Sequence, residues 1–434
     1  MADTRKKVLI ITYYWPPSGG SGVQRWLKFV KYLRDFGWEP IIYTPENPDF
    51  DIKDASLLEE IPKDIKIVKR PIWEPYKLAN FFSKKGQDST NAGFIDDASS
   101  RSVFGKIKYW IRANWFIPDP RRSWVSPSVK FLSKYLKEQP VDVIVSTGPP
   151  HSMHLIALKL QEHHDIPWLA DFRDPWTNID FFHKLPFSKG SLAKHHQLEQ
   201  RVLKNADQVV VVGNTMRQEF LAHTDHVSVI LNGHDLPKLA TYENTLDKEF
   251  SIAYIGSLNE DRNPEMLWQV LGELTQQNVS FAKKIIIRLI GKVSEKVSES
   301  IKSFGLKDHL QLVGYVAHSE AQKFQQRSQL LLLLVNNVPS AKGIVTGKVF
   351  EYIASGRPIL AIGPTDGDLA AILDESGAGT IFDFKDAISL KAHILQLFST
   401  YESGKLVGNA SEADKYSRKE GTRQLAKLLN DMTE

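Results

Sequence analysis

The sequence contains no cysteine among its 434 residues. This absence excludes disulfides and thiolate metal sites, and it is compatible with a reducing compartment such as the cytoplasm. Long apolar runs are also missing: Leu330–Val335 ends at polar residues on both sides, far short of the roughly 18 residues that a membrane-spanning helix needs. The short apolar run Val8–Ile11 gives way to aromatic residues and prolines, so the start of the sequence does not fit a signal peptide.

The excess of positive over negative charge is small. The formal net charge is only +4, too small to indicate nucleic-acid binding. The stretch 101–137 differs, since Asp119 is its single acid and aromatic residues are interleaved with its cations. Its basic residues are Arg101, Lys106, Lys108, Arg112, Arg121, Arg122, Lys130, Lys134 and Lys137. This mixture fits an anionic membrane surface or an anionic lipid-linked substrate, and equally a solvated helical face with aromatic residues packed beneath it.

Length and periodicity indicate two α/β domains. The chain exceeds the roughly 250–300 residues at which a single hydrophobic core stops growing. Short β-branched runs alternate with helical patterns, which is typical of parallel sheets. The first series is Val8–Trp15, Pro40–Thr44, Ile65–Arg70, Val141–Ser146, Pro167–Phe172, Val209–Val212 and Val227–Leu231, and the second is Ser251–Ile255, Ile285–Ile290, Leu310–Val316, Leu330–Val335, Pro358–Ile362 and Thr380–Phe384.

We therefore expect two doubly wound Rossmann-like domains, residues 1–235 and 250–412, joined by a polar linker at 236–249. Residues 413–434 are expected to hold a final helix, and the sequence does not indicate which domain it packs on. Its apolar stripe consists of Leu425, Leu428, Leu429 and Met432.

A glycine-rich loop, Gly19-Gly20-Ser21-Gly22, follows the first predicted strand and opens a helical pattern. Glycine allows close approach of backbone to a ligand, and free N–H groups at a helix start attract anions. The loop departs from a dinucleotide-binding fingerprint because Arg25 stands at the third glycine position and no acid ends the second strand. This argues against a hydride-transfer enzyme and leaves an anion-binding loop or a purely structural turn.

The segment Lys342–Pro358 carries the most specific signal. Thr346 and Gly347 start a predicted helix and can present N–H groups to a diphosphate, while Lys348 adds a full positive charge. Glu351 lies on the same helical face, where a carboxylate can accept two hydrogen bonds from a ribose diol. The alternative is a capped helix with an incidental ion pair.

Polar residues also follow two middle strands. Asp171, Arg173 and Asp174 can position or deprotonate an acceptor hydroxyl, or form a buried ion-pair network. His151 can contact a donor sugar or be structural. The histidines at 151, 154, 163 and 164 lack a carboxylate in a matching frame for a metal, and helix-cap chemistry explains Asp366-Gly367-Asp368.

These motifs, in this order, resemble the retaining glycosyltransferases of family 4. The match includes Tyr13–Pro17 with the glycine loop, Asp171–Trp176, Asn232–Asp235 and Ile255–Asn263. Glu351 corresponds to the second glutamate of the family's donor signature, whereas Gly343 stands at the first, which contacts the transferred sugar. Of the family's phosphate-binding basic pair, Ser257 replaces the first base and Arg262 remains.

The resemblance implies a GT-B fold, with two domains facing across a cleft, and transfer of a sugar from a nucleotide-diphosphate sugar to an acceptor hydroxyl with retention. From their positions after the middle strands, we assign candidate catalytic roles to His151, Asp171, Arg173 and Asp174. The donor-binding residues are expected to be Gly19, Gly20, Gly22, Arg25, Arg262, Thr346, Gly347, Lys348 and Glu351.

We expect no metal, no cofactor and no nucleic-acid partner. The expected acceptor is a cell-envelope glycan or a lipid-linked molecule, and the expected location is the cytoplasm, with attachment to the inner face of the membrane as an alternative. The rival functions are an inactive nucleotide-sugar-binding partner, favoured by Gly343, and a nucleotide-sugar epimerase.

Overall fold

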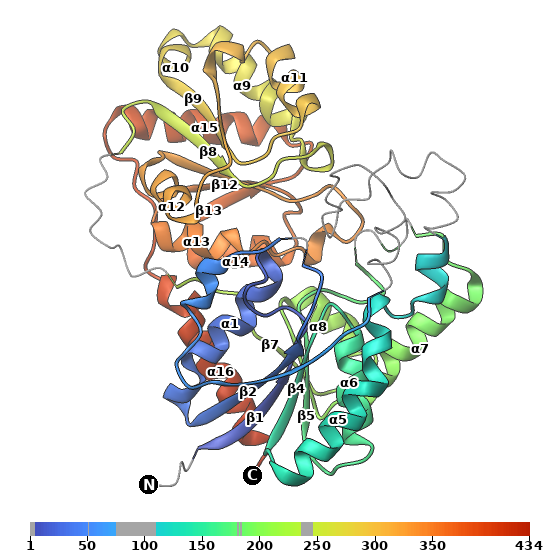
Figure 1. Ribbon diagram of the computed structural model, residues 1–434. Helices are drawn as coiled ribbons and strands as arrows, with labels where there is room; N and C mark the ends of the chain where they lie inside the picture. The colour runs from blue at the N-terminus through green and yellow to red at the C-terminus, as the bar shows by residue number, and fades with distance from the viewer. Residues whose placement is uncertain (1–4, 51, 75–109, 180–181, 183–184, 236–245) are drawn as a thin grey trace. The chain divides into compact units, whose positions relative to one another are not determined.

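A computed structural model describes residues 5–50, 52–74, 110–179, 182, 185–235 and 246–434. The chain divides into two compact units, the first formed by Met1–Leu231 with Arg418–Glu434 and the second by Asn232–Ser417 (Figure 1). Residues 236–245 of the predicted linker, and Arg101, Lys106 and Lys108 of the basic stretch, lie outside the described residues.

The N-terminal unit is built on a parallel sheet. In its described residues the strands follow the order β3-β2-β1-β4-β5-β6-β7. They are β1 (Lys6–Ile11), β2 (Trp38–Pro45), β3 (Lys66–Arg70), β4 (Val143–Gly148), β5 (Trp168–Phe172), β6 (Gln208–Val211) and β7 (Val227–Val229). Its helices include α1 (Ser21–Leu33), α5 (Val125–Glu138), α6 (Ser152–Gln161), α7 (Lys189–Asn205), α8 (Asn214–Phe220) and α16 (Arg418–Asp431), with a 3₁₀ turn η3 (Pro120–Trp124).

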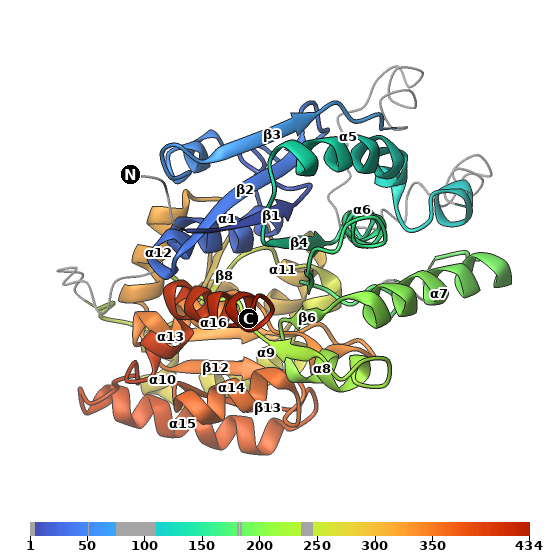
Figure 2. The ribbon, with the colours of Figure 1, turned by 90° about the horizontal axis from the view of Figure 1, so that it is seen from below.

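Alternation along β1 assigns the helices to the two faces of this sheet. Leu9 and Ile11 share one core cluster with side chains of α5, α6 and α7. Val8 and Ile10 point to the opposite face and share a second cluster with side chains of α1 and α16. Figure 2 shows α5 and α6 on one side of β1 and β4, with α1 and α16 on the other.

The final helix α16 belongs to the N-terminal unit although it ends the chain. Leu425 and Leu429 are buried in the same cluster as Trp26 and Leu27 of α1. The indole of Trp38 donates to Asn430 at 3.1 Å, which ties the helix to the start of β2.

The C-terminal unit contains a second parallel sheet, with the order β10-β9-β8-β11-β12-β13 among its described residues. Its strands are β8 (Phe250–Ile255), β9 (Ile285–Ile290), β10 (Leu310–Gly314), β11 (Leu330–Leu334), β12 (Ile359–Ile362) and β13 (Gly379–Phe382). Its helices are α9 (Glu265–Gln277), α10 (Val279–Lys284), α11 (Glu295–Ser303), α12 (His318–Arg327), α13 (Lys348–Ser355), α14 (Asp368–Ser376) and α15 (Ala387–Glu402).

The predicted pair of parallel α/β sheets is confirmed, and every predicted apolar run overlaps a strand of the described structure. The run Val8–Trp15 is longer than its strand, because β1 ends at Ile11. Tyr13 and Trp15 are buried in the loop that follows, so their apolar character reflects packing rather than strand pairing. Within the described residues, no helix has the length and apolarity needed to cross a membrane.

Candidate donor and acceptor sites

The helix α13 starts at Lys348 and stops at Gly356, as its sequence predicts. Gly347 is its N-cap, and Gly356 takes the left-handed conformation, with φ of 64°, that commonly ends a helix. The hydroxyl of Thr346 accepts the Lys348 backbone N–H at 3.2 Å. Thr346 therefore caps one amide of the first turn, which makes its hydroxyl part of the helix start.

Two cations of the C-terminal unit meet at one phenol. Lys348 Nζ and Arg262 Nη1 each lie 3.2 Å from Tyr254 Oη, and both donate to it. The phenol donates in turn to the Ser257 carbonyl at 3.0 Å. Arg262 is also held from its other side, because Nε donates to Asn336 Oδ1 at 2.8 Å. Residues that are far apart in sequence thus form a fixed dicationic cluster.

The charges around Tyr254 outweigh its burial. Burial by itself raises the pKa of a phenol, but Lys348 and Arg262 lower the pKa of Tyr254 below its ordinary value. The Lys348 ammonium also lies 4.5 Å from the centre of the Tyr254 ring. The cluster therefore stabilises negative charge at this position.

Gly256, directly after β8, makes room for the lysine. Its φ is +128°, and a Cβ there would lie 2.3 Å from Lys348 Nζ. Any other residue would be strained and would displace the ammonium.

Glu351 lies one turn into α13. Gln325 of α12, itself buried, donates to Glu351 Oε2 at 3.0 Å. No described residue donates to the other carboxylate oxygen, Oε1. The carboxylate is thus oriented by a neighbouring helix and retains an acceptor for a ligand.

The acidic pair Asp366 and Asp368 serves the local structure. Lys342 pairs with Asp366 at 2.5 Å and lowers the pKa of that carboxyl, while Asp368 lies in the first turn of α14. Among the described residues, no group of three His, Cys, Asp or Glu side chains is placed to hold a metal ion.

In the N-terminal unit, Arg25 and Asp171 form a buried ion pair. Arg25 Nε and Nη2 both lie 3.0 Å from Asp171 Oδ1, and Trp26 and Thr147 donate to Oδ2 at 2.7 and 2.8 Å. Asp171 is fully buried and Arg25 is 6% exposed. This geometry favours the ion-pair alternative for both residues over direct contact with a substrate, because their polar atoms already serve one another.

Arg173 links the loops that follow β1 and β4. Its guanidinium donates to the carbonyls of Gly22 and Pro149, and its Nε donates to the Gly148 carbonyl at 3.3 Å. Burial lowers the pKa of Arg173. Arg173 therefore stabilises the position of the glycine loop. Asp174, the next residue in the chain, is exposed at the surface.

The glycine loop also makes contacts with other parts of the N-terminal unit. Gly19 N–H donates to the Ile52 carbonyl at 2.9 Å, and Gly20, the N-cap of α1, has φ of 79°. A Cβ on Gly22 would lie 3.0 Å from the Tyr14 ring. The backbone at Gly20 therefore favours glycine, and Gly22 leaves little room for a larger side chain beside Tyr14.

His151 lies inside an aromatic cluster. Its ring stacks on Trp176 with centroids 4.7 Å apart and planes at 4°, and burial lowers its pKa well below the ordinary value. His154 accompanies it, with Nδ1 2.8 Å from Ser146 Oγ, and burial lowers its pKa to about 3. Both imidazoles are thus neutral at pH 7.

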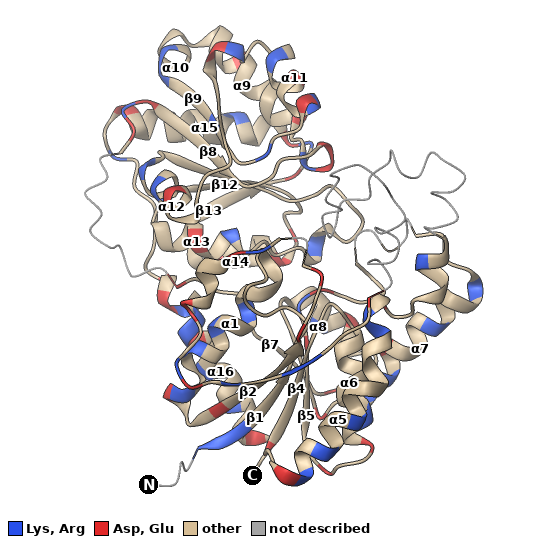
Figure 3. Ribbon diagram, in the orientation of Figure 1, with Lys and Arg blue, Asp and Glu red and all other residues tan. Residues whose placement is uncertain are grey.

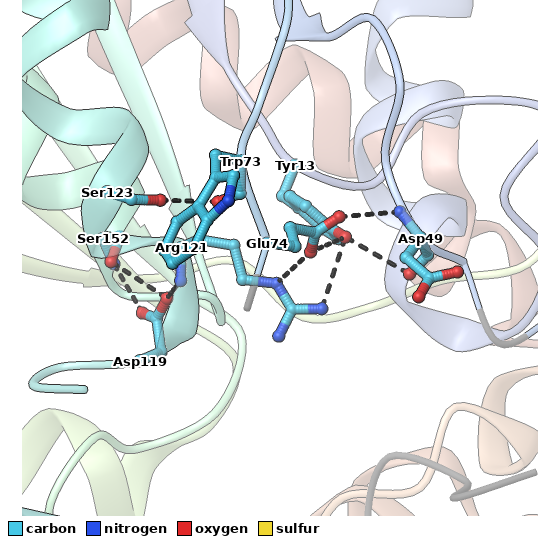
Figure 4. A network of polar contacts seen from close by, with 8 residues as sticks. All are labelled: Tyr13, Asp49, Trp73, Glu74, Asp119, Arg121, Ser123 and Ser152. Atoms are coloured by element: carbon cyan, nitrogen blue, oxygen red, sulfur yellow. Dashed lines mark hydrogen bonds and ion pairs between the residues drawn. The ribbon is translucent and has the colours of Figure 1, made fainter. Parts of the chain in front are cut away.

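A polar network that sequence analysis missed lies beyond the carboxyl ends of β1 and β3 (Figure 4). The buried carboxylate Glu74 accepts from Tyr13 Oη at 2.8 Å, pairs with Arg121 Nε at 3.1 Å and accepts from the Asp49 backbone at 2.8 Å. Asp119 accepts from the Ser152 backbone at 2.8 Å. The sequence places Arg121 in a basic stretch, and nothing in its spacing connects it to Glu74.

The C-terminal site also includes residues that were not predicted: Tyr254, Gln325 and Asn336. The one available signal is a tyrosine near the end of a strand, two residues before Gly256, since ligands bind at the carboxyl ends of parallel strands. The other two come from segments distant in sequence and carry no motif.

Comparisons with known proteins agree with this architecture. The family model "Glycosyl transferases group 1" matches residues 241–414, and the model "Glycosyltransferase Family 4" matches residues 93–238. No curated protein sequence gives a match.

Solved structures with the same fold include a sucrose-phosphate synthase from Thermosynechococcus elongatus, at TM-score 0.62, 13% identity and 99% coverage of both chains. HepE from Anabaena, solved with UDP-glucose, matches at TM-score 0.59 and 14% identity, over 98% of this chain and 100% of that one. WaaG, described as a glycosyltransferase involved in lipopolysaccharide biosynthesis, matches at TM-score 0.56 and 11% identity, over 97% and 99%.

Two Rossmann-like parallel sheets in one chain, shared with these structures, are the architecture of the GT-B glycosyltransferases. The two family models together extend over most of the sequence. The chain belongs to the family 4-like glycosyltransferases.

Proposed function

We propose that this glycosyltransferase takes its sugar from a nucleotide-diphosphate sugar bound in the C-terminal unit. The observation that carries the proposal is the convergence of Lys348 and Arg262 on Tyr254, one helical turn from Glu351. Two fixed cations suit a diphosphate, and a carboxylate with an unused oxygen suits a ribose diol. HepE, solved with UDP-glucose, supports a donor of this class.

In the proposed reaction, an acceptor hydroxyl oxygen bonds to the anomeric carbon while the bond to the diphosphate oxygen breaks. The hydroxyl proton passes to the departing diphosphate on the same face, so the configuration is retained. Lys348 and Arg262 stabilise the charge that develops on the leaving group, and no metal is required. The Thr346 and Gly347 amides add the positive end of α13.

Asp171, Arg25 and Arg173 are already engaged in contacts within the N-terminal unit. We therefore propose Asp174 as the carboxylate that faces an acceptor, with Asp171, Arg25 and Arg173 as positioning residues. Contacts of His151 with the donor sugar, and of the Gly19, Gly20 and Gly22 loop with the diphosphate, stay predictions.

We further propose that the acceptor is a cell-envelope glycan or a lipid-linked molecule and that the enzyme acts in the cytoplasm, at the inner face of a membrane. WaaG, which is involved in lipopolysaccharide biosynthesis, supports this class of acceptor. The exposed residues of the 101–137 stretch, Trp110, Trp115 and Arg122 among them, support an anionic surface as a partner.

The test is Lys348→Ala, assayed for donor hydrolysis and for transfer over a panel of nucleotide sugars. Loss of one electrostatic group at a leaving group typically costs about 10²–10³ in rate, so we expect kcat to fall by that factor. Lys342→Ala is the matched control, since Lys342 is a nearby exposed lysine that pairs with Asp366.

Near-normal turnover in Lys348→Ala would contradict the assignment. Nucleotide-sugar binding by the wild-type chain with neither hydrolysis nor transfer would instead favour the inactive binding protein that Gly343 suggests. Release of an epimerised sugar without acceptor would identify an epimerase.

A further inference from the structure

A groove of about 220 Å³ lies on the helical face of the N-terminal unit, among η3, the start of α5, α6 and α7. Its apolar lining is formed by Ile117, Val125, Leu155, Leu158 and Leu198. Leu155 and Leu198 are half-buried, whereas the other three are buried. The lining of the groove is therefore apolar, and Leu155 and Leu198 are the two of these side chains that remain partly accessible.

The rim of this groove is cationic. Its lining includes four basic residues, and no acidic residue is among the described residues that line it. The basic residues are Arg122, Lys159, Lys194 and Arg201. Arg201 pairs with Glu162 just outside the groove. Figure 3 shows further lysines and arginines along α5 and α7, so the rim belongs to a basic face.

Exposed apolar side chains lie at one end of the same groove. Trp115 is 67% exposed, and its carbonyl accepts from Arg122 Nη1 at 2.8 Å, which places the tryptophan next to the rim. Asn114 joins this segment to the start of α7, because its amide oxygen accepts from the Ser188 backbone at 2.7 Å. Trp110, four residues before Asn114, and Leu192, four residues after Ser188, are also exposed.

This combination fits the boundary of a membrane better than any soluble anion. A soluble phosphate would need cations but no apolar floor, and a solvated basic face would not expose tryptophan. Tryptophan is enriched at the level of lipid headgroups, and lysines and arginines are attracted to anionic lipids.

We propose that this groove binds an anionic phospholipid of a membrane surface, with its phosphate among Arg122, Lys159 and Lys194 and its acyl chain over Leu155 and Leu198. Trp115 inserts at the headgroup level beside it. The biological use of the site rests on the proposed function, but none of its residues belongs to the proposed donor site, so the two can fail independently.

The experiment measures binding of the full chain to vesicles of phosphatidylcholine, with and without phosphatidylglycerol, by flotation. We expect binding only when phosphatidylglycerol is present. Lys159→Gln/Lys194→Gln should weaken it about 25-fold, because each lysine at an anionic surface contributes roughly fivefold. Lys63→Gln/Lys69→Gln is the matched control, since it removes the same charge from exposed lysines on and near the β3 edge strand.

Trp115→Ala separates the apolar part from the charges. At high salt the contribution of the lysines is screened, and we expect the loss caused by Trp115→Ala to persist there. The proposal is overturned if neutral vesicles bind equally, if the control pair is as damaging as the groove pair, or if inorganic phosphate displaces the protein from vesicles at constant ionic strength. Binding of nucleoside diphosphate, measured on the same variants by thermal shift, reports on the donor site and should not change.

Discussion

The hydroxyl of Tyr254 accepts hydrogen bonds from two cations that come from different elements of the C-terminal unit. Without this acceptor, the Lys348 and Arg262 side chains would repel one another and adopt several rotamers. In the donor site that we propose, the phenol is therefore a positioning residue, which would hold the pair ready for a diphosphate before the ligand arrives.

Tyr254→Phe tests this role while keeping the buried ring. Because a hydrogen bond to a charged group contributes about 1.5–3 kcal/mol, we expect the affinity for a nucleoside diphosphate to fall about tenfold. The affinity for the nucleoside alone, which depends on Glu351, should stay the same. Calorimetric titration of both ligands measures the difference, and tighter diphosphate binding by the variant would contradict the positioning role.

The neutral histidines of the N-terminal unit predict a pH dependence of stability. The pKa of His154 is lowered to about 3, so between this value and about 6.5 the unfolded chain binds a proton that the folded chain does not. Stability is therefore complete above pH 6.5 and is lost as the pH falls. From pH 7 to pH 5 this residue alone should cost roughly 2 kcal/mol.

His154→Leu should be less stable than wild type at pH 7 but should lose about 2 kcal/mol less on acidification to pH 5. Urea unfolding at the two pH values measures the slope. His163→Leu is the control, because His163 is exposed and should leave the slope unchanged. Equal slopes in all three proteins would show that His154 does not stay neutral in the folded chain.

At the scale of elements, the ends of parallel strands position the candidate groups. Tyr254 lies at the end of β8 and Gly256 directly after it, the glycine loop follows β1, and Asp171 and Arg173 lie at and just beyond the end of β5. Helix starts then supply amides and caps. The same rule explains why the Glu74 network lies at this edge, since Tyr13 follows β1 and Glu74 follows β3.

The helix α16 completes the N-terminal unit by covering α1. Leu429 is fully buried in the cluster that contains Trp26. Leu429→Ala should destabilise this unit by about 2–5 kcal/mol, the usual cost of removing a buried leucine. Thermal unfolding with and without a nucleoside diphosphate measures it, because the ligand stabilises only the C-terminal unit if the donor site is placed correctly.

For Leu429→Ala we expect a lower first unfolding transition and an unchanged ligand-dependent one. Leu428→Ala on the partly buried flank of the same stripe is the matched control and should cost less. An equal effect on both transitions would mean that α16 stabilises the two units together.

At the scale of the whole molecule, the proposed reaction draws on both units. In that proposal Lys348 and Arg262 of one unit supply the positive charge for the leaving group, and Asp174 of the other unit supplies the acceptor-side carboxylate. We expect transfer to be unaffected by EDTA and not stimulated by added Mg²⁺, because the two side chains supply the charge that a metal would otherwise provide. Transfer rates with and without chelator measure this, and recovery of a lost activity by Mg²⁺ would contradict it.

The sequence by itself determined the fold. The spacing of apolar residues follows the repeat of the strand or helix whose buried face they form, and each predicted run overlaps a strand. It also identified the start of α13, since glycine and capping chemistry are local. Only the tertiary structure decided that α16 joins the N-terminal unit, that Tyr254 unites Lys348 with Arg262, and that Asp171 is buried against Arg25. The physical reason is that these contacts depend on the directions in which separate elements approach one another, and sequence spacing does not encode those directions.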